Sequence, residues 1–159
     1  MDVLAKKAQE VCKLLADNKM TVATAESCTG GMIAELFTSV SGASTVFSYG
    51  FVTYSNEAKQ KLLGVKKETL NQFGAVSSQT VIEMSEGALK AANADIAVSV
   101  SGIAGPTGGT VEKPVGLVYV GLSRKGKETT SHRFIFDGDR DSVRRQTVEK
   151  VFDLILNIR

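Results

Sequence analysis

The sequence predicts an α/β domain in which helices cover both faces of a mixed sheet. Segments with helical periodicity alternate with short β-branched runs along most of the chain, a pattern typical of α/β folds. Near the C-terminus, two strand-like runs, 115–123 and 128–136, flank the short turn Arg124-Lys-Gly-Lys127. This arrangement indicates a β-hairpin, and therefore an antiparallel part of the sheet. We expect the whole chain, residues 1–159, to form one domain.

The other elements follow from apolar periodicity and from capping residues. Long helices are expected over 3–18, from Ser77 or Ser78 to Ala92, and from Asp141 or Ser142 onward. Shorter helices are expected over 30–37, 57–63 and 67–73, the last two closed by Gly64 and Gly74. Strands are expected over 20–25, 45–54 and 95–100.

The composition argues against several classes of partner. The net charge is +2 with no basic run, and only 6% of residues are aromatic, so we expect no direct binding of nucleic acid. No segment is apolar over the length that a membrane span needs, and the N-terminus does not resemble a secretory signal. Two cysteines do not make a disulfide framework, so we expect a reduced, cytoplasmic protein.

The single histidine, His132, restricts the possible chemistry. One histidine excludes a two-histidine zinc site within one chain, and the spacing of the cysteines offers no substitute. A Ser-His-Asp triad would have to use His132, but this residue lies in a strand-like run where a solvated position is expected.

The first candidate site is Ala25-Glu-Ser-Cys-Thr-Gly-Gly31, between a strand and a helix. Ligands of α/β sheets collect at the carboxyl ends of strands, so Ser27 or Thr29 could be a nucleophile or an anion ligand. Either hydroxyl could instead only cap the helix. Cys28 is a rival nucleophile if a helix N-terminus lowers its pKa, or a small core residue if it points inward.

The second candidate is Tyr54-Ser-Asn-Glu-Ala-Lys59. A serine nucleophile without a usable histidine needs another base, and a desolvated Lys59 can serve, with Tyr54 orienting the proton. The alternative is an ordinary surface lysine on a helix.

The third candidate is the loop 101–116, which holds five glycines and both prolines of the chain. Such a shaped loop can hold a ligand with backbone N–H groups, and Arg140 suits contact with phosphate or carboxylate. The loop matches neither a Walker A sequence nor a dinucleotide-binding fingerprint, so a P-loop kinase or a Rossmann dehydrogenase is not expected.

These segments resemble the C-terminal domain family of the competence/damage-inducible protein CinA. Four blocks carry the resemblance: 25–31, 50–59, 74–77, and 101–106 continuing through 112–116. The resemblance implies a three-layer α/β/α sandwich that forms homodimers or higher homo-oligomers. It also implies hydrolysis of the carboxamide of nicotinamide mononucleotide to nicotinic acid mononucleotide and ammonia, in pyridine nucleotide (NAD) salvage, without metal or cofactor.

The resemblance also assigns roles to individual residues. Ser27 becomes the nucleophile, Lys59 the base, and Tyr54 a supporting group. The groups expected to contact substrate or the oxyanion are Thr29, Gly30, Gly31, Ser44, Ser101, Gly102 and Gly105, with Arg140 for the 5′-phosphate. The family often has Thr at the position of Ser101 and a different residue at Ala43, and neither departure removes a proposed catalytic group.

Two other functions fit the same residues. A non-catalytic nucleotide-binding regulatory module would use the glycine-rich loop and Arg140, and would leave Ser27 and Lys59 without a chemical task. An amidase of another small carboxamide would use the same catalytic residues on a different substrate.

Overall fold

The fold is a five-stranded mixed sheet with the strand order β2-β1-β3-β4-β5. The computed structural model describes residues 2–158. The strands are β1 (Val22–Glu26), β2 (Phe47–Val52), β3 (Ile96–Gly102), β4 (Leu117–Arg124) and β5 (Thr130–Ile135). The helices are α1 (Val3–Asp17), α2 (Met32–Thr38), α3 (Asn56–Leu63), α4 (Lys67–Phe73), α5 (Ser78–Ala92) and α6 (Arg140–Leu156), with a short 3-10 turn η1 (Ala43–Thr45). The first three strands run parallel, and β4 and β5 form the predicted hairpin.

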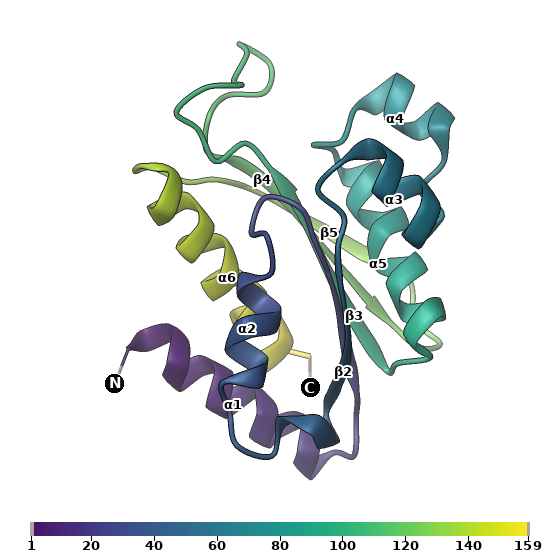
Figure 1. Cartoon of the computed structure of the whole chain (residues 1–159), viewed down its shortest axis with the longest axis vertical. Helices are drawn as coiled ribbons and strands as arrows, with labels where there is room; N and C mark the ends of the chain where they lie inside the picture. The colour runs from purple at the N-terminus through teal and green to yellow at the C-terminus, as the bar shows by residue number, and fades with distance from the viewer. Residues whose placement is uncertain (1, 159) are drawn as a thin grey trace.

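Helices cover both faces of this sheet, which confirms the predicted three-layer sandwich. Helices α1, α2 and α6 lie on one face, and α3, α4 and α5 lie on the other (Figure 1). The central strand β3 is buried on both faces, because Ile96 and Val98 enter the core under α1 and α6 while Ala97 enters the core under α5. None of the described helices is long and apolar enough to cross a membrane.

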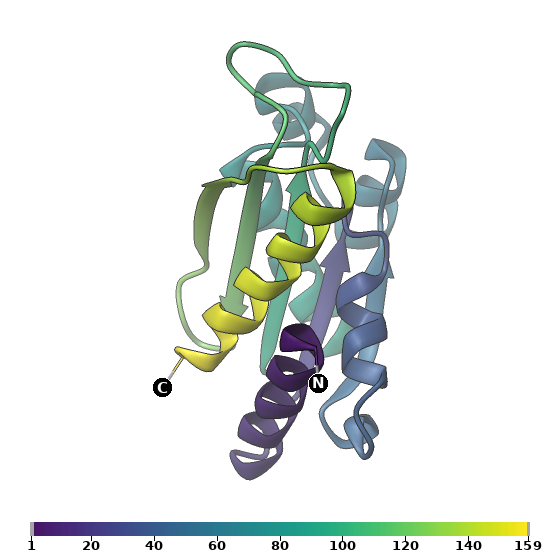
Figure 2. The ribbon, with the colours of Figure 1, turned by 90° about the vertical axis from the view of Figure 1, so that its left-hand side faces the viewer.

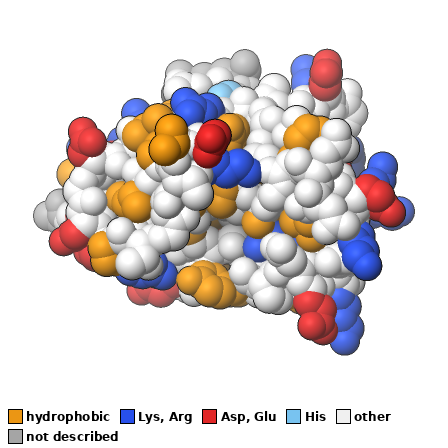
Figure 3. Space-filling model, turned by 90° about the horizontal axis from the view of Figure 1, so that it is seen from above, with side chains coloured by type: hydrophobic (Ala, Val, Ile, Leu, Met, Phe, Trp, Pro, Cys, Tyr) orange, Lys and Arg blue, Asp and Glu red, His pale blue; other side chains and the backbone are white. Residues whose placement is uncertain are grey.

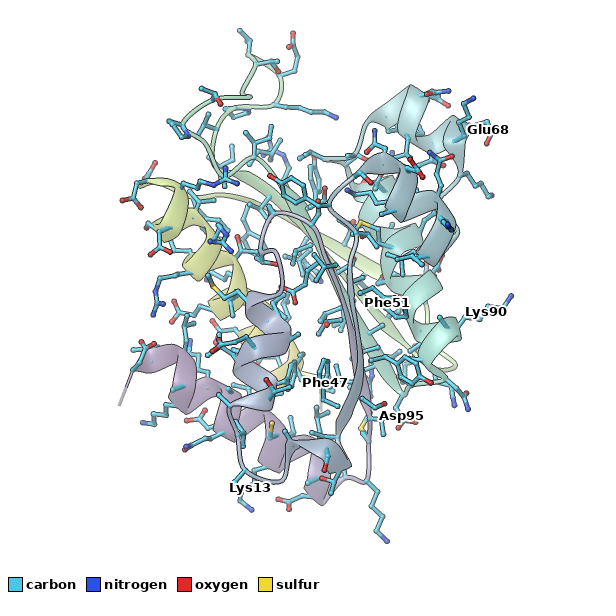
Figure 4. All side chains as sticks on the ribbon, in the orientation of Figure 1. Lys13, Phe47, Phe51, Glu68, Lys90 and Asp95 are labelled. Carbon is cyan, nitrogen blue, oxygen red and sulfur yellow. The ribbon has the colours of Figure 1, made fainter. Side chains whose placement is uncertain are left out.

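A register shift in β2 sends its aromatic residues to opposite faces. The pairing with β1 slips between Val22 and Ala23, so one residue of β2 is left over at this point. Before the shift, Phe47 stacks on Phe37 of α2, with ring centroids 5.3 Å apart. After it, Phe51 packs into the core on the α5 face, and Figure 4 shows the two phenylalanines on either side of the strand.

Most predicted elements are confirmed within a few residues, and two helix starts differ for local reasons. Helix α2 begins at Met32 rather than Gly30, because Gly30 and Gly31 have φ of 58° and 105°, which an α-helix cannot contain. Helix α6 begins at Arg140, because the side chain of Asp139 accepts a hydrogen bond from the N–H of Ser142 and caps the helix two residues before Asp141, the earlier of the two expected starts.

The topology brings the candidate segments to one end of the sheet. The parallel strands β1, β2 and β3 all finish at this end, so the segments that follow them, 27–31, 53–55 and 103–116, are neighbours in space. Figure 2 shows the loop that follows β3 rising above the strands at this end. Ligands of α/β sheets collect at this edge, which makes it the first place to search for a site.

Candidate active site

Ser27 and Lys59, which are 32 residues apart in the sequence, are in direct contact. Lys59 Nζ lies 3.1 Å from Ser27 Oγ. Ser27 comes directly after β1, and Lys59 lies on the first turn of α3. Lys59 is 1% exposed and Ser27 is 7% exposed, so the pair is shielded from bulk water. The alternative interpretation of Lys59 as an ordinary surface lysine is therefore wrong.

The surroundings of Lys59 favour the neutral amine. Its Nζ donates to the carbonyl oxygens of Thr53, at 2.9 Å, and Tyr54, at 3.3 Å. No carboxylate among residues 2–158 forms an ion pair with Lys59, and burial lowers the pKa of its amine. A neutral amine has two hydrogens and one lone pair. The two carbonyls use both hydrogens, so the lone pair is free to face the hydroxyl of Ser27.

Cys28 is not equipped to act as the nucleophile. Its thiol is buried, and desolvation raises the pKa of Cys28 to about 12, so the reactive thiolate is not formed at neutral pH. The interpretation in which a helix N-terminus activates this thiol is wrong. Helix α2 begins four residues later, and a carboxylate already accepts from its first N–H groups.

That carboxylate belongs to Glu26, a residue to which the sequence patterns assign no role. Its buried side chain accepts hydrogen bonds from the hydroxyl of Thr29, at 2.6 Å, and from the N–H groups of Ile33 and Ala34, at 2.9 and 3.0 Å. Glu26 therefore caps α2 from the end of the preceding strand. Because Glu26 caps α2, the alternative that Ser27 or Thr29 only caps the helix is wrong. The Oγ atom of Ser27 contacts Lys59 instead.

Arg144 on α6 fixes the same turn from the other side. Its guanidinium donates to the carbonyl oxygens of Cys28, at 3.1 Å, and Thr29, at 2.9 Å. No motif in the sequence points to Arg144, because the contact joins residues 115 and 116 positions apart. Glu26 and Arg144 together stabilise the turn that begins at Ser27.

Ser27 and Lys59 open into a cavity of about 270 Å³ at the carboxyl end of the parallel strands. Figure 3 shows the hollowed surface at this end of the molecule. Four further predicted residues line the cavity: Tyr54, Ser101, Gly102 and Arg140. The lining also includes five residues to which the sequence patterns give no binding role: Cys28, Asn56, Ala75, Val76 and Ala104. Ser27 and Lys59 thus face a pocket that is lined by both polar and apolar residues.

Arg140 and Tyr54 meet at the rim of this pocket. Arg140 Nη1 donates to the carbonyl oxygen of Gly105, at 2.9 Å, and Nη2 lies 3.4 Å from the hydroxyl of Tyr54. The backbone carbonyl of Tyr54, rather than its exposed hydroxyl, is the group that contacts Lys59. Arg140 thus connects the glycine-rich loop to the segment that carries Tyr54.

Several predicted residues lie outside the pocket of this chain. Ser44 lies in η1, before β2, and so at the opposite end of that strand from the pocket, where it lines a separate hollow. The expectation that Ser44 lies beside the reacting amide is therefore not met within one chain. Gly30 and Gly31 form the turn before α2, and the hydroxyl of Thr29 is directed to Glu26, so the side chain of Thr29 does not line the pocket. Half-buried His132 lies on the edge strand β5, away from the pocket.

A second hollow, of about 350 Å³, lies where α1 and α6 begin. Carboxylates dominate its lining, and Asp2 pairs with Arg145 there at 2.9 Å. The hydroxyl in its lining, that of Ser142, accepts a hydrogen bond from Gln146 at 3.0 Å. Within residues 2–158, no group of three or more His, Cys, Asp or Glu residues is arranged to hold a metal ion.

Comparison with known proteins places this site in a family context. The model of the CinA C-terminal domain matches residues 4–158. The chain is 57% identical to a CinA-like protein of Endomicrobium trichonymphae over 90% of this chain and 33% of that protein. It is 54% identical to the nicotinamide-nucleotide amidohydrolase PncC of Escherichia coli K12, over 90% of this chain and 87% of that protein. The chain thus spans about a third of the first of these relatives and nearly all of the second.

Solved structures agree with this match. The crystal structure of the competence/damage-inducible protein CihA from Agrobacterium tumefaciens superposes with a TM-score of 0.95 at 41% identity, covering 98% of this chain and 95% of that chain. A CinA superfamily protein from Escherichia coli superposes equally well, with a TM-score of 0.95 at 29% identity, covering 99% of this chain and 91% of that chain.

Proposed function

Because this chain belongs to the CinA C-terminal domain family, we propose that it is an amidohydrolase acting on the carboxamide of nicotinamide mononucleotide. The observation that carries the proposal is the buried contact of 3.1 Å between Lys59 Nζ and Ser27 Oγ. The name of the Escherichia coli relative, a nicotinamide-nucleotide amidohydrolase of nearly the same length, supports this choice of substrate.

The first half of the reaction forms an acyl-enzyme. Neutral Lys59 takes the proton of Ser27 as Oγ attacks the carboxamide carbon, and the carbonyl oxygen becomes an oxyanion. Lys59 then passes this proton to the amide nitrogen. The carbon–nitrogen bond breaks, ammonia leaves, and the nicotinoyl group remains as an ester on Ser27.

The second half restores the enzyme. Once ammonia has departed, Lys59 is neutral again, so the same amine can take a proton from an entering water. The resulting hydroxide attacks the ester carbon, the bond to Ser27 Oγ breaks, and the serine recovers its proton. The product is nicotinic acid mononucleotide. One buried base thus serves both halves, as a single histidine does in other serine hydrolases.

The oxyanion requires N–H groups that the fold has not already used. The N–H of Ser27 donates to Val100, and that of Gly30 donates to the carbonyl of Ser27. Among residues 2–158, the N–H of Cys28 has no backbone carbonyl partner, and it directly follows the nucleophile. We assign the oxyanion to this N–H, a type of contact often worth about 3 kcal/mol in the transition state.

The rest of the pocket suits the remaining parts of the nucleotide. The guanidinium of Arg140 has five N–H donors, and the structure uses two of them, which leaves donors for the 5′-phosphate. The small apolar side chains of Ala75, Val76 and Ala104 offer a wall for the pyridine ring. Ser101 and Asn56 supply polar groups near the ring substituent and the ribose.

We further propose that the enzyme works in the cytoplasm, in pyridine nucleotide salvage, and as a homo-oligomer. The small net charge and low aromatic content support a small-molecule substrate rather than a nucleic acid.

The test is hydrolysis of nicotinamide mononucleotide with a chelator present, following ammonia and nicotinic acid mononucleotide together. The wild type should release both in equal amounts, and free nicotinamide should react far more slowly because it lacks the phosphate. Activity on free nicotinamide alone would favour an amidase of another carboxamide. Tight nucleotide binding without any product would favour a binding module and overturn the proposal.

A further inference from the structure

The loop between β3 and β4 has two arms that are joined at both ends. At its base, Ile103 N–H donates to the carbonyl oxygen of Leu117, at 2.9 Å, and Gly116 N–H donates to that of Ile103, at 2.7 Å. At its tip, Thr110 N–H donates to the carbonyl oxygen of Lys113, at 2.8 Å, and Lys113 N–H donates to the hydroxyl of Thr110, at 3.0 Å. The two arms therefore form one unit.

The arms also pack directly against each other. A Cβ atom at Gly105 would overlap the side chain of Val115, and a Cβ atom at Gly109 would lie 2.7 Å from the backbone nitrogen of Val115. Glycine therefore allows an approach between the arms that a larger residue would prevent. Because the arms hold each other in place, the position of the loop over the pocket depends on its contacts with the rest of the protein.

The outer half of the loop depends on a single lysine for its attachment. Near the base, Arg140 donates to the carbonyl oxygen of Gly105. Farther out, Lys113 Nζ donates to the carbonyl oxygen of Phe73. Among the described residues, this is the only hydrogen bond between residues 106–113 and another part of the protein. No carboxylate in the described part of the chain pairs with the half-buried Lys113, so the carbonyl is the partner of its ammonium group.

The carbonyl of Phe73 is a favourable partner for a cation. It belongs to the last residue of α4, where carbonyl groups lack an intrahelical partner and carry the negative end of the helix dipole. The residue that follows, Gly74, leaves room for the ammonium group, since a Cβ atom there would lie 2.9 Å from Lys113 Nζ. The carbonyl of Gly74 accepts from the hydroxyls of Ser77, at 2.9 Å, and Thr80, at 2.7 Å. Lys113 thus attaches the loop to a segment that α5 holds in place.

Both of the segments that this contact joins line the pocket. Ala104 belongs to the base of the loop, and Ala75 and Val76 directly follow Gly74. Figure 1 shows the loop and α4 on either side of the strand ends. We propose that Lys113 is a positioning residue for substrate binding, which holds the loop where apolar side chains of both segments enclose the pyridine ring. This inference rests on the proposed function and assigns a role to a residue outside the pocket lining.

Loss of the contact should weaken binding and leave the chemistry unchanged. Ser27, Lys59 and the N–H of Cys28 belong to other segments, so a bound nucleotide still meets the same reacting groups. A loop that is not attached must be ordered when the nucleotide binds, and the lost conformational freedom reduces the affinity. An interaction that is equally strong in the bound substrate and in the transition state changes KM and not kcat.

The attachment is tested without substrate, by hydrogen exchange measured with mass spectrometry. Amides within residues 106–113 should exchange about tenfold faster in Lys113→Met than in the wild type, because the hydrogen bond of a charged group is lost. The matched control is Lys67→Met, which removes an exposed lysine of α4 that has no hydrogen bond or ion pair among the described residues, and should exchange like the wild type. Equal exchange in Lys113→Met and the wild type would overturn the attachment.

The role in binding is tested by steady-state kinetics on nicotinamide mononucleotide. Lys113→Met should raise KM about tenfold with kcat within about twofold of the wild type. Lys113→Arg, which keeps a cationic donor, should restore most of the affinity, and Lys67→Met should behave like the wild type. An unchanged KM in Lys113→Met, or a loss confined to kcat, would overturn this role. An inactive wild type would overturn the proposed function and the role in binding together, whereas the exchange measurement still decides the attachment.

Discussion

At the scale of single residues, the chemistry depends on how Lys59 loses its charge. Two backbone carbonyls and one serine hydroxyl surround its amine, and no carboxylate within residues 2–158 pairs with it. The residue types were predictable from the resemblance and from the lack of a useful histidine. The contacts of Lys59 with two carbonyls were not predictable, because the path of the chain after β2 decides where the oxygens of Thr53 and Tyr54 point.

The dependence of activity on pH should report this environment. In the proposed mechanism the neutral amine is the active form, and burial lowers the pKa of Lys59 from its ordinary value of 10.5. We therefore expect kcat/KM to rise with pH, with the midpoint of the rise below pH 10.5. A rate that falls as the pH rises through this range would show that the protonated amine is the active form.

Substitution of Cys28 should separate the two nucleophiles that the sequence left open. Because the thiol is buried and its pKa is raised to about 12, Cys28→Ala should keep most of the wild-type kcat, with a modest loss of stability from the missing core atom. Steady-state kinetics beside thermal unfolding measures both effects. A variant that folds but has no turnover would reassign the nucleophile to Cys28.

At the scale of elements, the start of α2 depends on one buried carboxylate. Helix ends with local caps were predictable: Ser77 caps α5, and Gly64 ends α3 with φ of 70°. The capping role of Glu26 was not predictable, because Glu26 lies at the end of a strand and accepts from N–H groups seven and eight residues later in the chain. The register shift in β2 was not predictable either, since it appears only in the pairing of β2 with the distant strand β1.

Removal of this carboxylate should weaken the whole domain. Glu26→Ala leaves two buried donors and one half-buried donor without a partner, so we expect a loss of about 3 kcal/mol in the free energy of unfolding. Denaturant unfolding measures the loss. Glu35→Ala, which removes an exposed acid from the same helix, is the control and should change stability little. Equal stability of the two variants would show that Glu26 is not the cap.

Close packing between α5 and α3 predicts an unusual effect of alanine. An alanine normally stabilises a helix by up to about 1 kcal/mol relative to glycine. At Gly87, however, a Cβ atom would overlap the backbone carbonyl of Leu63 at the end of α3. Gly87→Ala should therefore destabilise the protein, by about 1–3 kcal/mol. The exposed neighbour variant Glu86→Ala is the control, and a higher melting temperature for Gly87→Ala would contradict the packing.

At the scale of the whole molecule, the class of fold was predictable and its arrangement was not. Alternating helices and strands imply a layered α/β domain, and the hairpin implies a mixed sheet. The strand order, which leaves β2 at an edge, depends on contacts between distant segments that no local pattern encodes. Ser44 is absent from the pocket of its own chain because it lies before β2, at the opposite end of that strand from the pocket. The predicted site residues come together only where the parallel strands finish.

The central claim is that a buried serine–lysine pair hydrolyses a nicotinamide nucleotide. The most direct measurement compares ammonia release from nicotinamide mononucleotide by the wild type, Ser27→Ala and Lys59→Met, with folding verified by circular dichroism. We predict steady turnover by the wild type and loss of at least about 1,000-fold in each folded variant, as when one member of a nucleophile–base pair is removed. Undiminished release by either folded variant would contradict the account.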